Sequence, residues 1–284
     1  MKVLLLGRTG QVATEVIRRA PDGTTITALG RDRADLSQPG DCAEAILEAE
    51  ADAVINAAAW TAVDKAEEAE DAARVVNGEA PFAMALAAAK RGIPFVHIST
   101  DYVFDGQGTE PFTPESPVAP QNAYGRTKLL GEEGVRSAGG RHVILRTSWV
   151  FSAHGANFVK TMLRLGRERA EIGVVDDQVG GPTPAADIAD ACLGIARALR
   201  DGAEGGTHHL SGGPDVSWAD FARAIMEEVG LPCRVYPIPT SAYPTPAKRP
   251  LNSRMSGASL ESAFGIARPD WRRGLRDVLR ELGA

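Results

Sequence analysis

Short apolar runs alternate with longer amphipathic stretches through the first half of the chain. Each run is nearly continuous, which is typical of strands buried on both faces of a parallel sheet. The stretches between the runs space their apolar residues as amphipathic helices do. The expected strands are Lys2–Leu6, Thr24–Leu29, Ala53–Asn56, Pro94–Ile98 and His142–Thr147, and the expected helices are Gln11–Arg19, Cys42–Glu50, Arg74–Arg91 and Ala123–Arg136.

This alternation predicts an α/β fold in which right-handed crossovers build a doubly wound parallel sheet of the Rossmann type. After about residue 150 the segments shorten and turn signals dominate, among them the proline-rich stretch Tyr236–Pro250. Asp187–Arg200 still has the pattern of one helix, which we expect to return to the first domain. We predict a dinucleotide-binding domain of residues 1–150 plus about 184–205, and a smaller α/β substrate lobe of 151–183 plus 206–284.

Composition narrows the class of protein. Of 284 residues, 44% are hydrophobic and 24% charged, which is ordinary for a globular chain. The net charge of −6, without a run of basic residues, argues against nucleic acid as a partner. No apolar stretch approaches the ~20 residues that cross a bilayer. Cys42, Cys192 and Cys233 form no CxxC pair, so neither a disulfide framework nor a zinc site is expected. We expect a soluble cytoplasmic protein with no membrane partner.

A glycine motif follows the first apolar run. Residues 7–13 read GRTGQVA, a GxxGxxA spacing between the first expected strand and helix. Glycine allows a tight turn, and a helix N-terminus offers N–H groups and partial positive charge to a pyrophosphate. We predict a dinucleotide site contacted by Gly7, Thr9, Gly10, Gln11 and Val12, with a plain strand–helix turn as the alternative.

The end of the second expected strand bears on the choice of cofactor. NAD sites place an acid there for the ribose 2′-hydroxyl, whereas an arginine accommodates a 2′-phosphate. Here Gly30 is followed by Arg31 and Asp32. Arginine binds phosphate in a bidentate way, so NADPH is favoured and NADH is left open. The alternative has Arg31 in solvent and Asp32 on the ribose.

Small residues end the third expected strand. Ala57, Ala58 and Ala59 follow Asn56. Their size would let the backbone approach a nicotinamide ribose, although compact packing explains it equally well.

The candidate chemistry lies further along. Thr100 follows the fourth expected strand, at the sheet edge where such folds bind ligands. Tyr124 and Lys128 stand four residues apart, on one face of an expected helix. A nearby ammonium lowers the pKa of a phenol from its usual value near ~10, which suits acid–base work. We predict that Thr100 holds a substrate carbonyl oxygen beside Tyr124; a lone YxxxK is usually structural, but its position in this order favours a site.

Several motifs in order resemble one known family. They are GxxGQV, NAAAWTAVDKAE, STDYVFDG, YGRTK, RTSWVF, DDQVGGPT and TSAYPTPAKRPLNS, which extend from Gly7 to Asn252. Together they resemble the extended short-chain dehydrogenases/reductases, and among those the dTDP-4-dehydrorhamnose reductases. The glycine and YxxxK motifs are widely shared, whereas RTSWV, DQxGxPT and SAYPTPxxRPxNS are specific to this branch.

The resemblance implies NADPH-dependent reduction of the C4 ketone of dTDP-4-dehydro-β-L-rhamnose, with Tyr124 as proton donor. Thr100, Tyr124 and Lys128 match the catalytic set, and Asp101 and Trp149 match sugar-pocket positions. The positions matching the cofactor site are Gly10, Gln11, Val12, Asp35, Leu36, Ala59, Thr61, Tyr124 and Lys128.

Two positions depart from the pattern of the family. Gly30 stands where other members can carry an acid, which bears on cofactor preference. Some relatives dimerise around Mg²⁺ through carboxylates, and Glu15 alone has a counterpart in this sequence. We therefore predict no metal and leave a homodimer open.

The second lobe offers candidates for the nucleotide end of a dTDP-sugar. Arg249, with Lys248 and Arg254 nearby, could face the pyrophosphate, or these could be solvated cations on a stiff surface loop. Two other functions stay open: reduction of a related dTDP-4-keto-6-deoxysugar, and a non-catalytic NADP-binding regulatory subunit.

Overall fold

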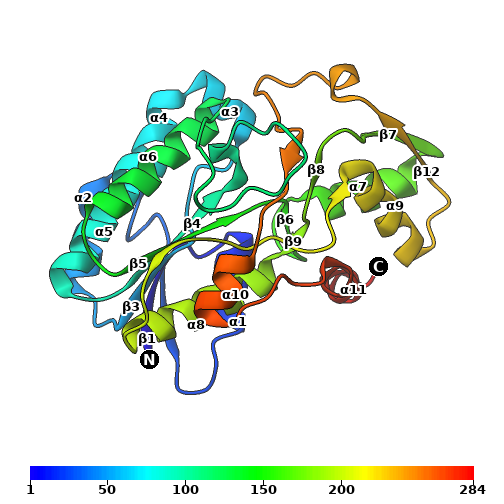
Figure 1. The fold of residues 1–284 in the computed structure, drawn as a ribbon. Helices are drawn as coiled ribbons and strands as arrows, with labels where there is room; N and C mark the ends of the chain where they lie inside the picture. Colours follow the sequence, from blue (N-terminus) through cyan, green and yellow to red (C-terminus); the bar gives the residue numbers. More distant parts are fainter.

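A parallel sheet forms the centre of the larger part of the molecule (Figure 1). The computed structural model describes residues 1–284. Six strands lie in the order β10-β5-β4-β3-β1-β2, and every neighbouring pair is parallel. Their bounds are β1 Lys2–Leu6, β2 Thr25–Leu29, β3 Ala53–Asn56, β4 Phe95–Thr100, β5 His142–Thr147 and β10 Gly206–His209.

Helices cover both faces of this sheet (Figure 1). Along β1, Leu4 and Leu6 belong to the core under one layer, while Val3 and Leu5 belong to the core under the other. The first layer contains α2 (Pro39–Glu48), α5 (Ala80–Arg91) and α6 (Ala123–Ser137), and the second contains α1 (Gln11–Arg18), α8 (Ala185–Arg200) and α10 (Ala258–Phe264). The predicted doubly wound fold is confirmed, and α8 returns to the large sheet as expected.

The expected helix Arg74–Arg91 is interrupted. Helix α4 (Glu70–Arg74) leads into a π-helical turn at Val75–Glu79, and α5 then continues. Asn77, inside that turn, is buried and hydrogen-bonds the backbone of Trp60 and the hydroxyl of Thr127. A further short helix, α3 (Val63–Glu68), precedes this segment and was not predicted.

The smaller lobe holds a separate core. Phe221 and Trp271 are fully buried there and pack edge to face. Its helices are α7 (Phe158–Glu168), α9 (Trp218–Val229) and α11 (Trp271–Leu282), and its strands are β6 (Val150–Phe151), β7 (Glu171–Val175), β8 (Val179–Gly180), β9 (Thr183–Pro184), β11 (Val216–Ser217), β12 (Arg234–Ile238) and β13 (Asn252–Ser253). None of the helices is both long and apolar enough to span a membrane.

One segment assigned to the lobe lies in the large sheet. Residues 206–209 form β10, whose residues pair in register with Val143–Arg146 of β5. Helix α10 likewise contributes Leu260 to the core beneath that sheet. The large sheet and its cover therefore draw on the chain well beyond residue 205, although the division into two units stays a prediction.

Candidate active site

The glycine turn lies against the end of β3. Gly7 has φ +108°, a conformation that favours glycine, and a Cβ there would lie 3.4 Å from the backbone of Ala57 and Ala58. Gly10 precedes α1 and supplies no side-chain cap, so the first N–H groups of the helix lack a side-chain acceptor. This cradle, formed by backbone alone, fits a dinucleotide pyrophosphate.

The other predicted cofactor residues differ in how exposed their side chains are. Thr9, Arg31 and Thr61 are exposed, whereas the side chains of Val12 and Leu36 lie in hydrophobic cores. These two could therefore meet a cofactor mainly through their backbone or the rim of the side chain.

Asp35 and Gln11 each have partners within the protein. The Ser37 N–H donates to Asp35 Oδ1 at 2.9 Å, and this backbone hydrogen bond lowers the pKa of Asp35. Gln11 Oε1 accepts hydrogen bonds from Ser152 and Asn157, which ties the start of α1 to the segment leading into α7.

An ion pair forms beside Arg31 at the end of β2. Arg8 Nη2 lies 3.3 Å from Asp32 Oδ1, and a Cβ at Gly30 would come within 2.7 Å of that carboxylate oxygen. Asp32, the alternative ribose ligand, is thus paired with a cation. Arg8 is a second arginine at the predicted 2′-phosphate position, and the sequence prediction did not include it.

The start of α6 is set by local sequence. Asn122 Oδ1 accepts from the Gly125 N–H at 2.8 Å, which caps the helix just before Tyr124. Gly125 also lets the helix approach the turn that follows β4, because a Cβ there would lie 2.2 Å from the Tyr102 carbonyl oxygen. Tyr102 and Tyr124 meet edge to face, with ring centroids 5.4 Å apart.

Thr100 and Tyr124 come together at the carboxyl end of β4. Burial raises the pKa of Tyr124 to about 12, and the hydrogen-bonding Thr100 side chain opposes that rise. Thr100 Oγ1 also donates to Asp101 Oδ1 at 3.1 Å. Burial raises the pKa of Asp101 to about 6, against hydrogen bonds from Ser253 and Thr100. The prediction that a nearby ammonium lowers the pKa of the Tyr124 phenol is wrong, because burial raises it instead. The phenol therefore keeps its proton at neutral pH, as a proton donor must.

Lys128 is buried, one helical turn after Tyr124 on α6. Its Nζ donates to the Ile98 carbonyl oxygen at 2.7 Å, and only 2% of the residue is exposed. Burial lowers the pKa of Lys128 to about 8, while the charge of Glu132 raises it. An amine that titrates near neutrality can take part in proton movements.

A buried ion pair fixes α6 against β5. Arg146 contacts Glu132 at two points, with Nε to Oε1 at 2.8 Å and Nη2 to Oε2 at 2.7 Å. Ser99 also donates to Glu132, and the Arg146 guanidinium lies 4.9 Å from the centre of the Phe104 ring. This network supports the helix that carries Tyr124 and Lys128.

Trp149 lies where β5 passes into the lobe. It is the non-glycine residue with positive φ, at +51°, and its ring stacks on Trp218 with centroids 3.6 Å apart. A backbone conformation of this kind in a bulky residue needs support from its surroundings. The stack joins the carboxyl end of the large sheet to α9 of the lobe.

Arg249 forms an ion pair with an acidic residue of the larger part of the molecule. Its Nη2 lies 2.7 Å from Asp64 Oδ2 in α3, and a fifth of the side chain remains exposed. Asn122 Nδ2 donates to the Lys248 carbonyl oxygen, so the proline-rich loop reaches the start of α6. Burial raises the pKa of the Tyr102 phenol, and the charge of Arg249 opposes that rise.

Glu15 belongs to a cluster that the sequence did not predict. Glu15, His154 and Glu281 place ligand-type atoms within 4.8 Å of one another. Arg18 Nη1 contacts all three, at 3.3 Å from Glu15, 2.6 Å from His154 and 2.6 Å from Glu281. A guanidinium thus supplies positive charge among these groups.

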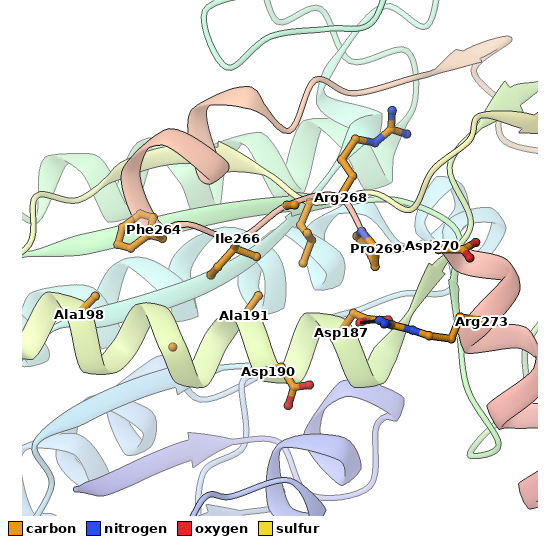
Figure 2. Close-up of a pocket in the computed structure, with 13 residues that line it drawn as sticks. Asp187, Asp190, Ala191, Ala198, Phe264, Ile266, Arg268, Pro269, Asp270 and Arg273 are labelled. Carbon is orange, nitrogen blue, oxygen red and sulfur yellow. Dashed lines mark ion pairs between the residues drawn. The ribbon is translucent and has the colours of Figure 1, made fainter.

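A cavity of about 440 Å³ lies away from this site, between α8 and the segment before α11 (Figure 2). Phe264 and Ile266 point toward α8, and Asp187 pairs with Arg273 at one end. None of the predicted site residues lines it.

Sequence reasoning missed several residues near Tyr124 and Lys128. Tyr102 packs against Tyr124 and His97 contacts Lys128. Thr147 lies in register beside Thr100, with a buried hydroxyl that has no partner. The register of β4 with β5 could have pointed to Thr147, since paired residues share a face of the sheet.

Comparisons with known proteins identify relatives that match the whole length of this chain. The family model described as RmlD substrate binding domain matches residues 1–284. The chain is 45% identical over 295 residues to the dTDP-4-dehydrorhamnose reductase of Burkholderia thailandensis, covering 99% of each chain. A dTDP-4-dehydrorhamnose reductase structure from Clostridium acetobutylicum matches with TM-score 0.94 and 37% identity, covering all of both chains. That from Bacillus anthracis, in complex with NADP, matches with TM-score 0.91 and 33% identity, covering 99% of each.

Proposed function

Since this chain belongs to the family of dTDP-4-dehydrorhamnose reductases that the RmlD substrate binding domain defines, we propose that it is such a reductase. It reduces the C4 ketone of dTDP-4-dehydro-β-L-rhamnose to dTDP-L-rhamnose. The observation that carries this proposal is the arrangement at the carboxyl end of β4, where partly buried Tyr124 adjoins Thr100 and buried Lys128 follows one turn later on α6. A non-catalytic NADP-binding subunit has no physical need for that arrangement.

NADPH is the proposed cofactor. The cradle of Gly7, Gly10 and the β3 end fits its pyrophosphate, and the relative from Bacillus anthracis binds NADP. Arg31 and Arg8 provide positive charge near the place of a 2′-phosphate. NADH stays open because Gly30 provides no repelling acid.

The residues have separate tasks in the proposed reaction. NADPH, when bound, supplies a hydride to the substrate. Tyr124 gives its proton to the ketone oxygen as negative charge develops there, and Thr100 holds that oxygen beside the phenol. Lys128 lies within reach along the same helix face and favours the tyrosinate that remains.

The remainder of the substrate would be held by both units. Asp101 and Trp149 stand next to the reacting end, and Arg249 is the proposed ligand of the pyrophosphate. Binding energy from the unreactive nucleotide can then position the ketone. A homodimer and a cytoplasmic location stay predictions, the first checked by sedimentation velocity.

The test is turnover of the proposed substrate by the purified protein. Loss of NADPH absorbance should require dTDP-4-dehydrorhamnose, and NMR of the product should show a C4 alcohol of the L-rhamno configuration. Parallel reactions use NADH and related dTDP-4-keto-6-deoxysugars. Faster turnover of one of those sugars would assign the chain to that substrate instead, and tight NADPH binding without turnover of any would favour the regulatory alternative.

A further inference from the structure

Three buried polar side chains form a chain that ends at Lys128, one helical turn after Tyr124 on α6. Asn56 ends β3, His97 lies in β4 and Lys128 lies in α6, and their exposed fractions are 1%, 0% and 2%. Asn56 Nδ2 lies 3.1 Å from His97 Nδ1, and His97 Nε2 lies 3.4 Å from Lys128 Nζ. The imidazole ring therefore connects the amide of Asn56 to the amine.

The orientation of the Asn56 amide is fixed from the other side. Its Oδ1 accepts from the Ala58 N–H at 3.1 Å, and a backbone N–H requires an acceptor there. Nδ2 consequently faces His97 and donates to Nδ1, which must carry a lone pair. Burial of the ring is the largest cause that holds the pKa of His97 well below its usual value, so the ring is neutral. Its single proton must be on Nε2.

This tautomer points an N–H at Lys128. The Nζ already donates to the Ile98 carbonyl oxygen. An ammonium has no lone pair, so it could not accept the hydrogen bond that His97 Nε2–H offers. A neutral amine can accept it. We propose that Asn56 and His97 are positioning residues that set the proton affinity of Lys128, with Asn56 selecting the tautomer of His97 that favours the neutral amine.

The charged groups around this chain do not cancel the effect. On its own helix Lys128 faces Glu132, but that carboxylate is bound by Arg146 from β5 and by Arg136. His142, at the start of β5, is the other cation-forming group that acts on His97, and it opposes protonation of the ring. No carboxylate hydrogen-bonds His97 to favour the opposite tautomer.

The consequence rests on the proposed role of Lys128 in the reductase. An amine held near its titration point can gain a proton when negative charge develops close by and lose it afterwards. Asn56 and His97 would thereby set the pH above which Lys128 no longer supports Tyr124.

The first experiment reads the tautomer directly, without substrate or cofactor. NMR of protein with ¹⁵N-labelled histidine should show His97 Nδ1 unprotonated and Nε2 protonated from about pH 6 to 9. The ¹³Cε signal of Lys128 gives the titration of the amine in the same samples. A proton on Nδ1 of the wild-type ring, or an imidazolium, overturns the inference.

The second experiment changes the tautomer. Asn56→Ala removes the donor to Nδ1, and Asn56→Asp supplies an acceptor for an Nδ1 proton, so both should turn Nε2 into an acceptor. The pKa of Lys128 should rise by about half to one unit in both, as expected for one hydrogen bond. The alkaline limb of kcat/KM should move by the same amount.

Asn77→Ala is the matched control. Asn77 is equally buried and also lies near α6, but it bonds Trp60 and Thr127 rather than His97. This variant should leave both titrations unchanged, whatever its effect on thermal stability. If Asn56→Asp shifts Lys128 and Asn56→Ala does not, added charge is responsible and the inference is wrong. The expected tautomer in a protein without reductase activity would count against the proposed function alone.

Discussion

The guanidinium of Arg249 is paired with the carboxylate of Asp64, with Nη2 and Oδ2 2.7 Å apart. The proline-rich loop of the lobe is thereby linked to α3 of the larger unit. A pyrophosphate arriving at this arginine would compete with an existing ion pair. The role of Arg249 can therefore be tested by changing either Arg249 or Asp64.

Arg249→Ala should weaken the binding of dTDP about ten- to a hundredfold, since a charge-assisted contact to phosphate is lost. Arg249→Lys should recover part of the affinity because the planar fork is missing. Asp64→Asn should keep or strengthen binding by releasing the guanidinium. Calorimetric titration with dTDP alone measures all three.

Arg234→Ala serves as the control, because Arg234 is exposed and pairs with Glu171 in the lobe. If dTDP binds Arg249→Ala as tightly as the wild type, Arg249 is a structural cation. If dTDP does not bind the wild type, the proposed substrate class is wrong.

Tyr124→Phe should lower kcat by roughly 10²–10⁴, the contribution of a positioned proton donor, with NADPH affinity nearly unchanged. Stopped-flow turnover and fluorescence titration with NADPH separate the two effects. Tyr236→Phe, a half-exposed tyrosine of the lobe, should behave as the wild type. Unaltered turnover of Tyr124→Phe would remove this residue from the chemistry.

Arg31→Ala should weaken NADPH more than NADH. Loss of one charge-assisted contact to the 2′-phosphate corresponds to about 1.5–3 kcal/mol, while NADH has no such group. Arg8→Ala tests the neighbouring arginine, which also forms an ion pair with Asp32. Dissociation constants for both cofactors decide the matter: equal losses would place Arg31 away from the phosphate.

Glu132→Gln should destabilise the fold by about 3–5 kcal/mol, because Arg146 would be left buried without a counter-charge. The double change Glu132→Gln with Arg146→Met should cost less than this variant alone. Urea unfolding measures both, and Glu168→Gln, in the exposed pair with Arg164, should change stability by under ~1 kcal/mol.

The same pair predicts an acid dependence. Burial raises the pKa of Glu132, but the hydrogen bond and charge of Arg146 outweigh burial and leave it below the usual value. A carboxyl whose folded pKa lies below its unfolded pKa stabilises the fold above the unfolded value near ~4.3, and that contribution is lost as pH falls through the folded value. Glu132→Gln should therefore flatten the fall in stability at acid pH. An identical slope in both proteins would contradict this assignment.

Continuous apolar patterns predicted most of the large sheet. The bounds of β1, β3 and β5 agree with the sequence prediction, because each run is buried on both faces. β10 was missed, since its residues Gly206–His209 have no apolar run and extend only by pairing with β5. Strand β12 contains Pro237. It tolerates the proline because it pairs with β7 alone, so its other edge has no partner strand.

The sequence predicted those site residues that are related by their spacing along the chain. It missed those that meet only through contacts in the folded structure. Tyr124 and Lys128 are related by helical periodicity, which a sequence displays. His97 reaches Lys128 only through the pairing of β4 with its neighbours and the docking of α6. Asp64 meets Arg249 across 185 residues of chain, a distance that no local pattern encodes.

The stacked indoles of Trp149 and Trp218 have a practical consequence for measurement. Fluorescence from stacked rings depends strongly on their overlap, and this pair joins the sheet edge to α9. Trp271 lies in the interior of the lobe, so a shift of the lobe as a body leaves its surroundings unchanged. A change in tryptophan fluorescence would therefore report movement of the lobe relative to the large sheet, without an attached dye.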